Sequence, residues 1–127
     1  MLEIKDSVAV ITGGASGIGL SLAAYWLKNG GKVVIGDVVA DALKKAKQDL
    51  SGPVETVLCD VTKEEDCGRL ADAAIQAFGQ INLVAPFAGI IKDGLLLSTD
   101  RETGKVNKKM PLESFQKVID INLTGVF

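Results

Sequence analysis

The stretch Thr12-Gly13-Gly14-Ala15-Ser16-Gly17-Ile18-Gly19 decides the fold of this chain. It follows Val8-Ala9-Val10-Ile11, a continuous apolar run typical of a strand buried on both faces of a parallel sheet. After it, apolar residues recur at helical spacing as far as Asn29-Gly30-Gly31, a favourable helix stop. The expected core face of this helix consists of Leu20, Ala23, Ala24 and Leu27. The sequence therefore predicts a glycine-rich turn between a buried strand and a helix.

Such a turn suits a phosphate group. Gly13, Gly17 and Gly19 permit a tight turn and a close approach of the backbone, and the helix directs free N–H groups and its positive dipole end at the ligand. The spacing is Gly-x-x-x-Gly-x-Gly, which differs from the usual G-x-G-x-x-G fingerprint of dinucleotide-binding proteins. The alternative is a tight turn that binds nothing.

Strands and helices alternate along the rest of the first ninety or so residues. Residues 32–37, 54–59 and 82–87 are expected to be strands, and residues 41–50 and 63–78 helices. The second of these helices has an apolar stripe of Leu70, Ala74, Ala77 and Phe78. Short links imply right-handed crossovers. The predicted fold is α/β, a doubly wound parallel sheet of Rossmann type, present as its first half with about four strands.

The chain is expected to form one dinucleotide-binding half-domain over residues 1–127, with a surface insertion at about 92–109. That insertion is mixed in charge and contains glycine, and a small hairpin around Thr103-Gly104 suits it. Its alternatives are a solvated loop, a contact with a neighbouring subunit or one side of a substrate entrance. Pro111 suits the first turn of a final helix, which Leu123 continues.

Asp37 follows Gly19 by eighteen residues and ends the second predicted strand. A carboxylate at this position can accept hydrogen bonds from the ribose hydroxyls of an adenosine, and it repels a 2′-phosphate. Neither Ser16 nor Val38 supplies a cation to hold that phosphate. We therefore expect NAD rather than NADP. The alternative is a solvated carboxylate at a strand end.

Composition excludes several classes of function. The net charge of -2 argues against nucleic acid, and no apolar run is long enough to span a membrane. The chain has no histidine and only two cysteines, Cys59 and Cys67, so no zinc site is expected. Without a recognisable signal peptide, both cysteines are expected to be reduced and the protein cytoplasmic. Cys59 is expected in the core.

Four motifs together resemble the short-chain dehydrogenase/reductase family. They are Thr12-Gly13-x-x-x-Gly17-x-Gly19, Asp60-Val61-Thr62, Ala88-Gly89 and Asn122-Leu123-Thr124-Gly125, and the match covers nearly the whole chain. The resemblance implies that Ser16, Gly17 and Ile18 contact ribose and pyrophosphate, and that Asp60 and Val61 contact the adenine. It also implies that Ala88 and Gly89 line the adenine and ribose trough, and that Asn122 is a catalytic residue of the proton relay. Alternatively, Asp60 caps the next helix and Asn122 is a polar residue on a helix flank.

The chain departs from the family pattern in three places. Pro86 and Phe87 stand where the family has two asparagines, which puts the local geometry and the cofactor affinity in question. The link at 92–109 is about ten residues longer than usual. The family's catalytic Ser and Tyr-x-x-x-Lys lie downstream of Asn122, so these 127 residues are expected to be inactive alone. Tyr25, the only tyrosine, is expected to be a packing residue.

The resemblance implies an oxidoreductase that transfers a hydride between NAD(H) and a secondary alcohol or ketone, similar to the 3-oxoacyl-carrier-protein reductases. The alternative function is a non-catalytic dinucleotide-binding module or redox sensor. No membrane or nucleic-acid partner is expected, and the resemblance favours a homo-oligomer, a dimer or a tetramer. A half-sheet that covers its open edge by self-association is a further alternative.

Overall fold

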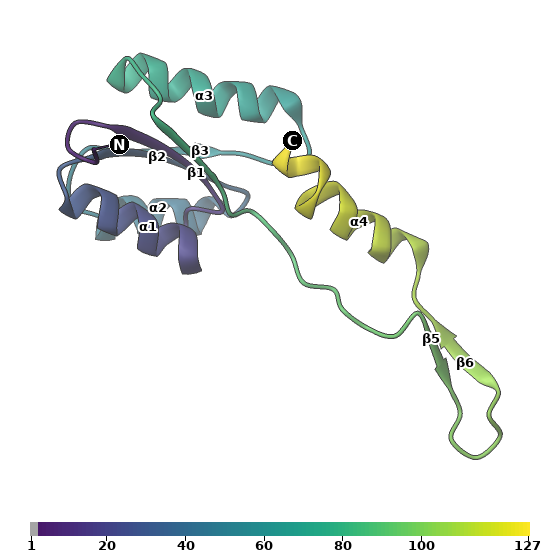
Figure 1. Cartoon of the computed structure of the whole chain (residues 1–127). Helices are drawn as coiled ribbons and strands as arrows, with labels where there is room; N and C mark the ends of the chain where they lie inside the picture. The colour runs from purple at the N-terminus through teal and green to yellow at the C-terminus, as the bar shows by residue number, and fades with distance from the viewer. Residues whose placement is uncertain (1–2) are drawn as a thin grey trace. The chain divides into compact units, whose positions relative to one another are not determined.

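The computed structural model describes residues 3–127, which divide after Ala88 into two compact units. The first unit alternates strands and helices in the predicted order (Figure 1). Its elements are β1 (Val8–Thr12), α1 (Gly17–Lys28), β2 (Lys32–Asp37), α2 (Ala40–Asp49), β3 (Val54–Leu58), α3 (Glu64–Phe78) and β4 (Leu83–Pro86). No helix within residues 3–127 combines the length and the apolar character that a membrane crossing requires.

The four strands form one parallel sheet in the order β3-β2-β1-β4. The order reverses beside β1, because β2 and β3 extend from one side of it and β4 pairs with the other side. Ligands of open α/β sheets bind at the carboxyl ends of the strands at such a reversal. The predicted Rossmann-type α/β fold is confirmed, and its reversal point places β1, β2 and β4 around one potential binding edge.

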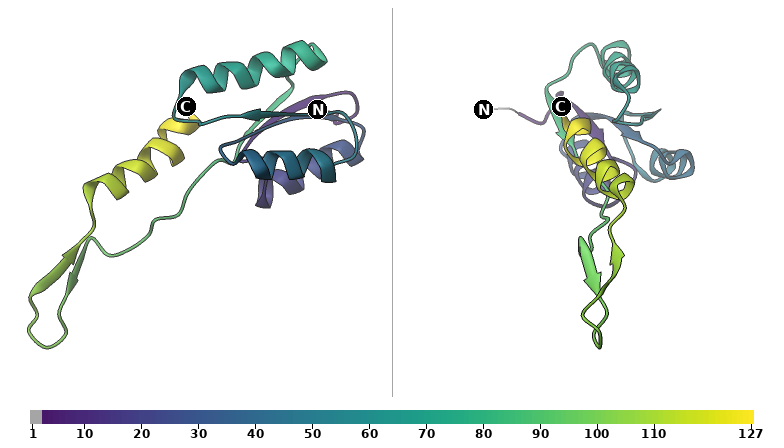
Figure 2. Two further views of the ribbon diagram at one scale, coloured as in Figure 1. Left: turned by 180° about the vertical axis from the view of Figure 1, so that it is seen from behind. Right: turned by 90° about the vertical axis from the view of Figure 1, so that its right-hand side faces the viewer.

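Helices cover both faces of this sheet, as two viewing directions show (Figure 2). α1 and α2 pack on one face against Ala9, Ile11, Val33 and Ile35, whereas α3 packs on the other against Val8, Val10 and Val34. Successive residues of a strand point to opposite faces, which explains why the central residues of β1 and β2 are apolar without a break. Burial of each Val or Ile contributes about 1.5–3 kcal/mol to stability.

The buried face of α1 differs from the predicted stripe. Gly19, Ala23 and Trp26 are buried, while Leu20 and Leu27 are only partly buried and Ala24 is exposed. Gly19 has no side chain, so the helix packs closely against the Gly13 backbone at this point. The buried face of the helix is therefore centred on the side that contains Gly19. Tyr25, expected to be a packing residue, lies outside this buried face and is 57 % exposed.

In α3 the expected stripe is also only partly right. Leu70 and Ala74 are buried and Phe78 is half-buried, but Ala77 is exposed. The helix ends at Gly79, whose positive φ of 78° provides the left-handed turn that stops it.

The second unit contains an antiparallel hairpin and a helix. The strands β5 (Leu97–Thr99) and β6 (Val106–Lys109) pair around a turn held by Asp100, whose carboxylate accepts the N–H groups of Glu102 and Thr103. α4 (Leu112–Asn122) follows, and a short 3₁₀ turn, η1 (Thr124–Val126), comes after Leu123. The final helix thus ends at Asn122, and Leu123, which was expected to continue it, is its C-cap and donates its N–H to the Ile119 carbonyl at 3.0 Å. Pro111 directly precedes the helix.

Candidate functional site

The inner side of the glycine-rich turn between β1 and α1 leaves no room for side chains at Gly13 and Gly19. A Cβ on Gly13 would lie 2.8 Å from both the Ala88 nitrogen and the Phe87 oxygen, and one on Gly19 would collide with the Gly13 carbonyl. Gly13 and Gly17 have positive φ angles of 63° and 53°, which L side chains rarely adopt. A Cβ on Gly17, by contrast, would meet nothing within 4 Å. The turn is therefore packed on its inner side and open beside Gly17.

The N-terminus of α1 has the features of an anion-binding site. Its N-cap Ser16 makes no side-chain capping hydrogen bond, and the first turn contains no acidic residue. Ser16 and Ile18 are exposed, with 75 % of Ile18 accessible. Free N–H groups and the positive end of the helix dipole therefore face solvent, an arrangement that fits a phosphate or pyrophosphate.

Asp37 ends β2 and holds the glycine turn. Its Oδ2 accepts the N–H of Ala15 at 3.3 Å, and its Oδ1 accepts the N–H of Val39 at 3.1 Å. The side chain stays half-buried, and none of the ion pairs within residues 3–127 involves it. Asp37 is therefore linked to the glycine turn through Ala15 and keeps its negative charge free of any ion pair in the described part of the chain.

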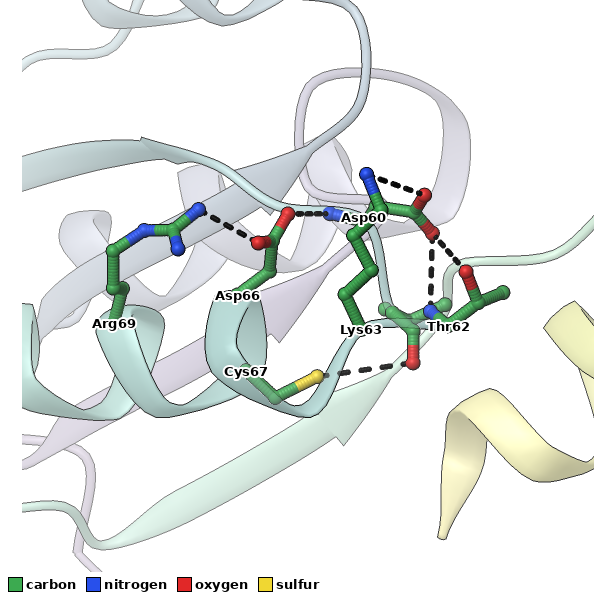
Figure 3. Close-up of polar contacts among 7 residues, drawn as sticks. Asp60, Thr62, Lys63, Asp66, Cys67 and Arg69 are labelled. Carbon is green, nitrogen blue, oxygen red and sulfur yellow. Dashed lines mark hydrogen bonds and ion pairs between the residues drawn. The ribbon is translucent and has the colours of Figure 1, made fainter.

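Asp60 follows β3 and is held by several hydrogen bonds (Figure 3). Its Oδ1 accepts the N–H of Thr62 at 3.0 Å and the hydroxyl of Thr62 at 2.7 Å. These bonds, from the hydroxyl first and then the backbone, lower the pKa of Asp60. Lys63 stands 3.8 Å from Oδ2 and is itself the N-cap of α3. The alternative that Asp60 caps α3 is therefore wrong, because Asp60 instead closes a turn with Thr62.

Thr12 braces the turn from the end of β1, a role that the sequence alone did not reveal. Its carbonyl accepts the N–H of Phe87 at 3.2 Å, and its hydroxyl accepts the N–H of Ala88 at 3.2 Å. Pro86 is the last residue of β4 and pairs in register with Thr12, so its missing N–H falls where the strand ends. Phe87 is 45 % exposed.

In the second unit, Asn122 binds the segment that begins at Gly89. Its Oδ1 accepts the N–H of Ile90 at 2.9 Å, and its Nδ2 donates to the Ile90 carbonyl at 2.8 Å. A Cβ on Gly89 would lie 3.3 Å from the same Oδ1, so a larger residue there would press on this pair. Asn122 is therefore more than a polar residue on a helix flank, because its amide satisfies both backbone groups of Ile90.

The two cysteines offer no reactive group at the sheet edge. Cys59 is 2 % exposed, which confirms its place in the core, and burial followed by the neighbouring Cys67 raises its pKa to about 12. Cys67 donates a weak bond of 3.8 Å to the Val61 carbonyl. Within residues 3–127, no group of three His, Cys, Asp or Glu residues is arranged to hold a metal ion.

The predicted residues of the first unit gather at one edge of the sheet. Each follows the carboxyl end of a strand: the glycine turn follows β1, Asp37 ends β2, Asp60 and Val61 follow β3, and Ala88 follows β4. Gly89 and Asn122 belong to the second unit, where they lie beside each other. A family model for short chain dehydrogenases matches residues 7–127 of this chain.

The chain belongs to the short-chain dehydrogenase family. Zerumbone synthase from Zingiber zerumbet is 34 % identical over 128 residues, covering 99 % of this chain and 45 % of that enzyme. The 3-hydroxyacyl-CoA dehydrogenase type-2 of Drosophila melanogaster is 34 % identical over 126 residues, covering 98 % and 47 %. The chain thus spans about half the length of these relatives.

Solved structures agree with this assignment. A 3-ketoacyl-(acyl-carrier-protein) reductase from Brucella melitensis, complexed with NADH, is 28 % identical with a TM-score of 0.79, and the match covers 97 % of this chain and 47 % of the reductase. LigO from Sphingobium sp. strain SYK-6, in its apo form, is 26 % identical with a TM-score of 0.82, covering 99 % and 44 %. Short-chain dehydrogenases are oxidoreductases, and this chain corresponds to somewhat under half of each solved chain.

Proposed function

We propose that this chain binds NAD(H) at the sheet edge and that the intact protein transfers a hydride between NAD(H) and a secondary alcohol or ketone. The observation that carries the proposal is the pairing of an uncapped helix N-terminus at Ser16 with the Asp37 carboxylate, joined through the N–H of Ala15. One feature suits a pyrophosphate and the other suits ribose hydroxyls. The NADH-bound reductase supports the same assignment by its similarity.

The residues present fit the cofactor. The backbone of Ser16, Gly17, Ile18 and Gly19 would hold the pyrophosphate, and the open space beside Gly17 leaves room for it. Gly13 would let the turn approach the ligand closely. When bound, the nicotinamide supplies or accepts the hydride, and the chain's own residues bind and orient it.

At the adenine end, Asp60 and Val61 would hold the ring. Thr62 occupies Oδ1 of Asp60, which leaves Oδ2 to accept the adenine amino group. The Val61 backbone would meet the ring, and Ala88, together with Gly89, would line the trough. Asn122 is proposed to act in the proton relay, where its side-chain bonds to Ile90 fix the segment after Gly89.

We propose a preference for NAD over NADP. A 2′-phosphate would lie next to the Asp37 carboxylate, and the residues that flank it, Val38 and Val39, are exposed and uncharged. Two negative groups at contact distance repel each other.

We further propose that the substrate is a small alcohol or ketone and that the protein works as a cytoplasmic homo-oligomer.

Turnover by the intact protein tests this function. The purified protein is mixed with NADH and a panel of ketones that includes a 3-oxoacyl thioester, and the loss of NADH absorbance is followed. Consumption of NADH that depends on one ketone supports the proposal. Tight binding of NADH without turnover of any ketone, or of any alcohol with NAD, would instead support a non-catalytic dinucleotide-binding module.

A further inference from the structure

Asp66 lies outside the motifs of the proposed cofactor site, yet it forms a hydrogen bond with Asp60, the residue proposed to bind the adenine. Its Oδ2 accepts the N–H of Asp60 at 2.9 Å, and its Oδ1 accepts Nη2 of Arg69 at 2.7 Å, as Figure 3 shows. The side chain of Asp66 is only 13 % exposed, whereas that of Arg69 is 57 % exposed. One carboxylate thus links a surface arginine to the backbone of Asp60.

This bond is not ordinary helix capping. Asp66 is the third residue of α3, and a carboxylate at this position usually reaches back to the N–H of the N-cap residue. Here the N-cap is Lys63, whose N–H already donates to the Asp60 carbonyl at 2.9 Å. Asp66 therefore binds no N-cap group but the N–H of Asp60, which lies three positions before the N-cap, near the start of the connection between β3 and α3.

The consequence is that Asp60 is fixed at both its backbone and its side chain. Asp66 holds its N–H, and Thr62 holds its Oδ1 through two bonds. Only Oδ2 keeps a loose neighbour, the 65 % exposed Lys63 at 3.8 Å. The backbone bond from Asp60, and then Arg69, lower the pKa of Asp66, so it remains an anionic acceptor near neutral pH.

We propose that Asp66 is a positioning residue for adenine recognition, acting through the backbone of Asp60, with Arg69 holding Asp66 in place. The inference rests on the proposed function, because it assigns Asp66 to the adenine end of that same site. Preorganised acceptors bind a ligand more tightly because less freedom is lost on binding. Asp66 is thus expected to affect the recognition of the adenine amino group and not the rest of the cofactor.

Calorimetric titration of the intact protein with two ligands tests this role. One ligand is NADH, and the other is its hypoxanthine analogue, in which the ring carries an oxygen in place of the amino group. The wild type is expected to bind NADH about tenfold more tightly than the analogue, since the analogue loses a hydrogen bond to a charged acceptor. In Asp66→Ala this preference is expected to fall to about twofold or less, with most of the loss in NADH affinity.

Two further variants separate positioning from folding. Asp66→Asn keeps an oxygen that can accept the Asp60 N–H, so it is expected to restore most of the preference for NADH. Glu65→Ala removes the same charge from the same turn of α3, but Glu65 is exposed and makes no ion pair within residues 3–127, so it should bind like the wild type.

The outcomes are distinct. If Asp66→Ala lost affinity for NADH and for the analogue equally, or if Glu65→Ala reproduced its effect, Asp66 would have only a structural role and the proposal would be overturned, while NADH binding by the wild type would leave the proposed function standing. If the wild type bound neither ligand, the proposed function would fail and the positioning role with it.

Discussion

Asp37 makes two backbone hydrogen bonds, and one of them reaches into the glycine turn at Ala15. The same carboxylate is therefore available to shape the turn and to select the ribose. These two roles lead to different expected effects on cofactor binding when Asp37 is substituted. Loss of the bond to Ala15 affects any ligand of the turn, whereas loss of the negative charge affects NAD and NADP in opposite directions.

We therefore predict that Asp37→Ala weakens NADH binding by about tenfold or more, the effect of removing a hydrogen bond to a charged group. NADPH binding should weaken less or improve, because the repulsion of its 2′-phosphate is removed. Fluorescence titration with both cofactors measures this, with Asp41→Ala, an exposed carboxylate in α2, as the control. An equal loss for both cofactors would contradict a selective role.

Gly13 and Gly17 give a second prediction, because both have positive φ but only one has neighbours. Gly13→Ala should destabilise the fold by more than about 2 kcal/mol, since strain adds to a clash with Phe87 and Ala88. Gly17→Ala should cost only about 1–2 kcal/mol of strain, yet its methyl group enters the space left for the pyrophosphate.

Thermal unfolding and NADH titration together test this pair. Gly17→Ala is predicted to keep a cooperative unfolding transition and to lose NADH affinity. Retention of wild-type affinity in Gly17→Ala would show that the open side of the turn does not face the cofactor.

For single residues, the sequence predicted which residues stand at the sheet edge better than it predicted their hydrogen bonds. The glycines, Asp37 and Asp60 stand at strand ends as expected, because motif spacing and strand patterning determine those positions. The bonds of Thr12 to Ala88 and of Asp66 to Asp60 were not predictable, since they join residues by rotamer and by tertiary proximity. The burial of Trp26 and the exposure of Tyr25 were also not predictable, since a helix can direct only one of two successive aromatics at the sheet.

Among the elements, α4 is joined to the segment before the hairpin through one side chain, that of Asn122. None of its side chains is fully buried, and Phe115 is 49 % exposed. The two bonds of Asn122 to Ile90 therefore stabilise the segment after Gly89 with little help from apolar packing. The hairpin itself is short and exposed, and isolated two-stranded hairpins are marginally stable.

We predict that Asn122→Ala accelerates amide hydrogen exchange at Ile90 by about tenfold or more, because its N–H loses its acceptor. Exchange in β1 and β2 should not change, since those strands belong to the buried sheet of the first unit. Exchange measured by mass spectrometry or NMR on both proteins tests this. Unchanged protection at Ile90 would mean that another group holds the segment.

The elements show where sequence patterning is reliable. The strands β1 and β2 were predictable because their central residues are apolar on both faces, and the helix ends were predictable from Asn29-Gly30 and Gly79. The helix faces were less predictable, because Gly19 turns α1 towards the sheet although it contributes no hydrophobic side chain. Leu123 continues the apolar pattern of α4 and caps it, and the backbone changes to a 3₁₀ turn only from Thr124.

For the whole molecule, three acidic side chains make the stability fall at acid pH. The pKa values of Asp60 and Asp66 are lowered in the folded chain by Thr62 and by the Asp60 N–H, respectively. Asp100 in the hairpin turn is similarly affected by Thr103. Native carboxyl groups then bind fewer protons than unfolded ones, so their stabilisation is fully present above the unfolded value of about 3.9 and is lost as the pH falls through the lower folded values.

The melting temperature should therefore change little through these groups between about pH 7 and about pH 5, and should fall below about pH 4. Asp66→Asn should melt at a lower temperature near neutral pH and show a shallower acid decline, because one of these groups no longer titrates. Circular dichroism melts across this range provide the test. Parallel curves for the two proteins would exclude a stabilising role for the Asp66 charge.

Every role proposed for these residues requires that NAD(H) binds at the sheet edge. Equilibrium titration of the intact wild-type protein with NADH and NADPH, under identical conditions, tests this most directly. We predict saturable binding of NADH at least about tenfold tighter than that of NADPH, in line with repulsion of the 2′-phosphate by Asp37. Tighter binding of NADPH, or no binding of either cofactor, would contradict it.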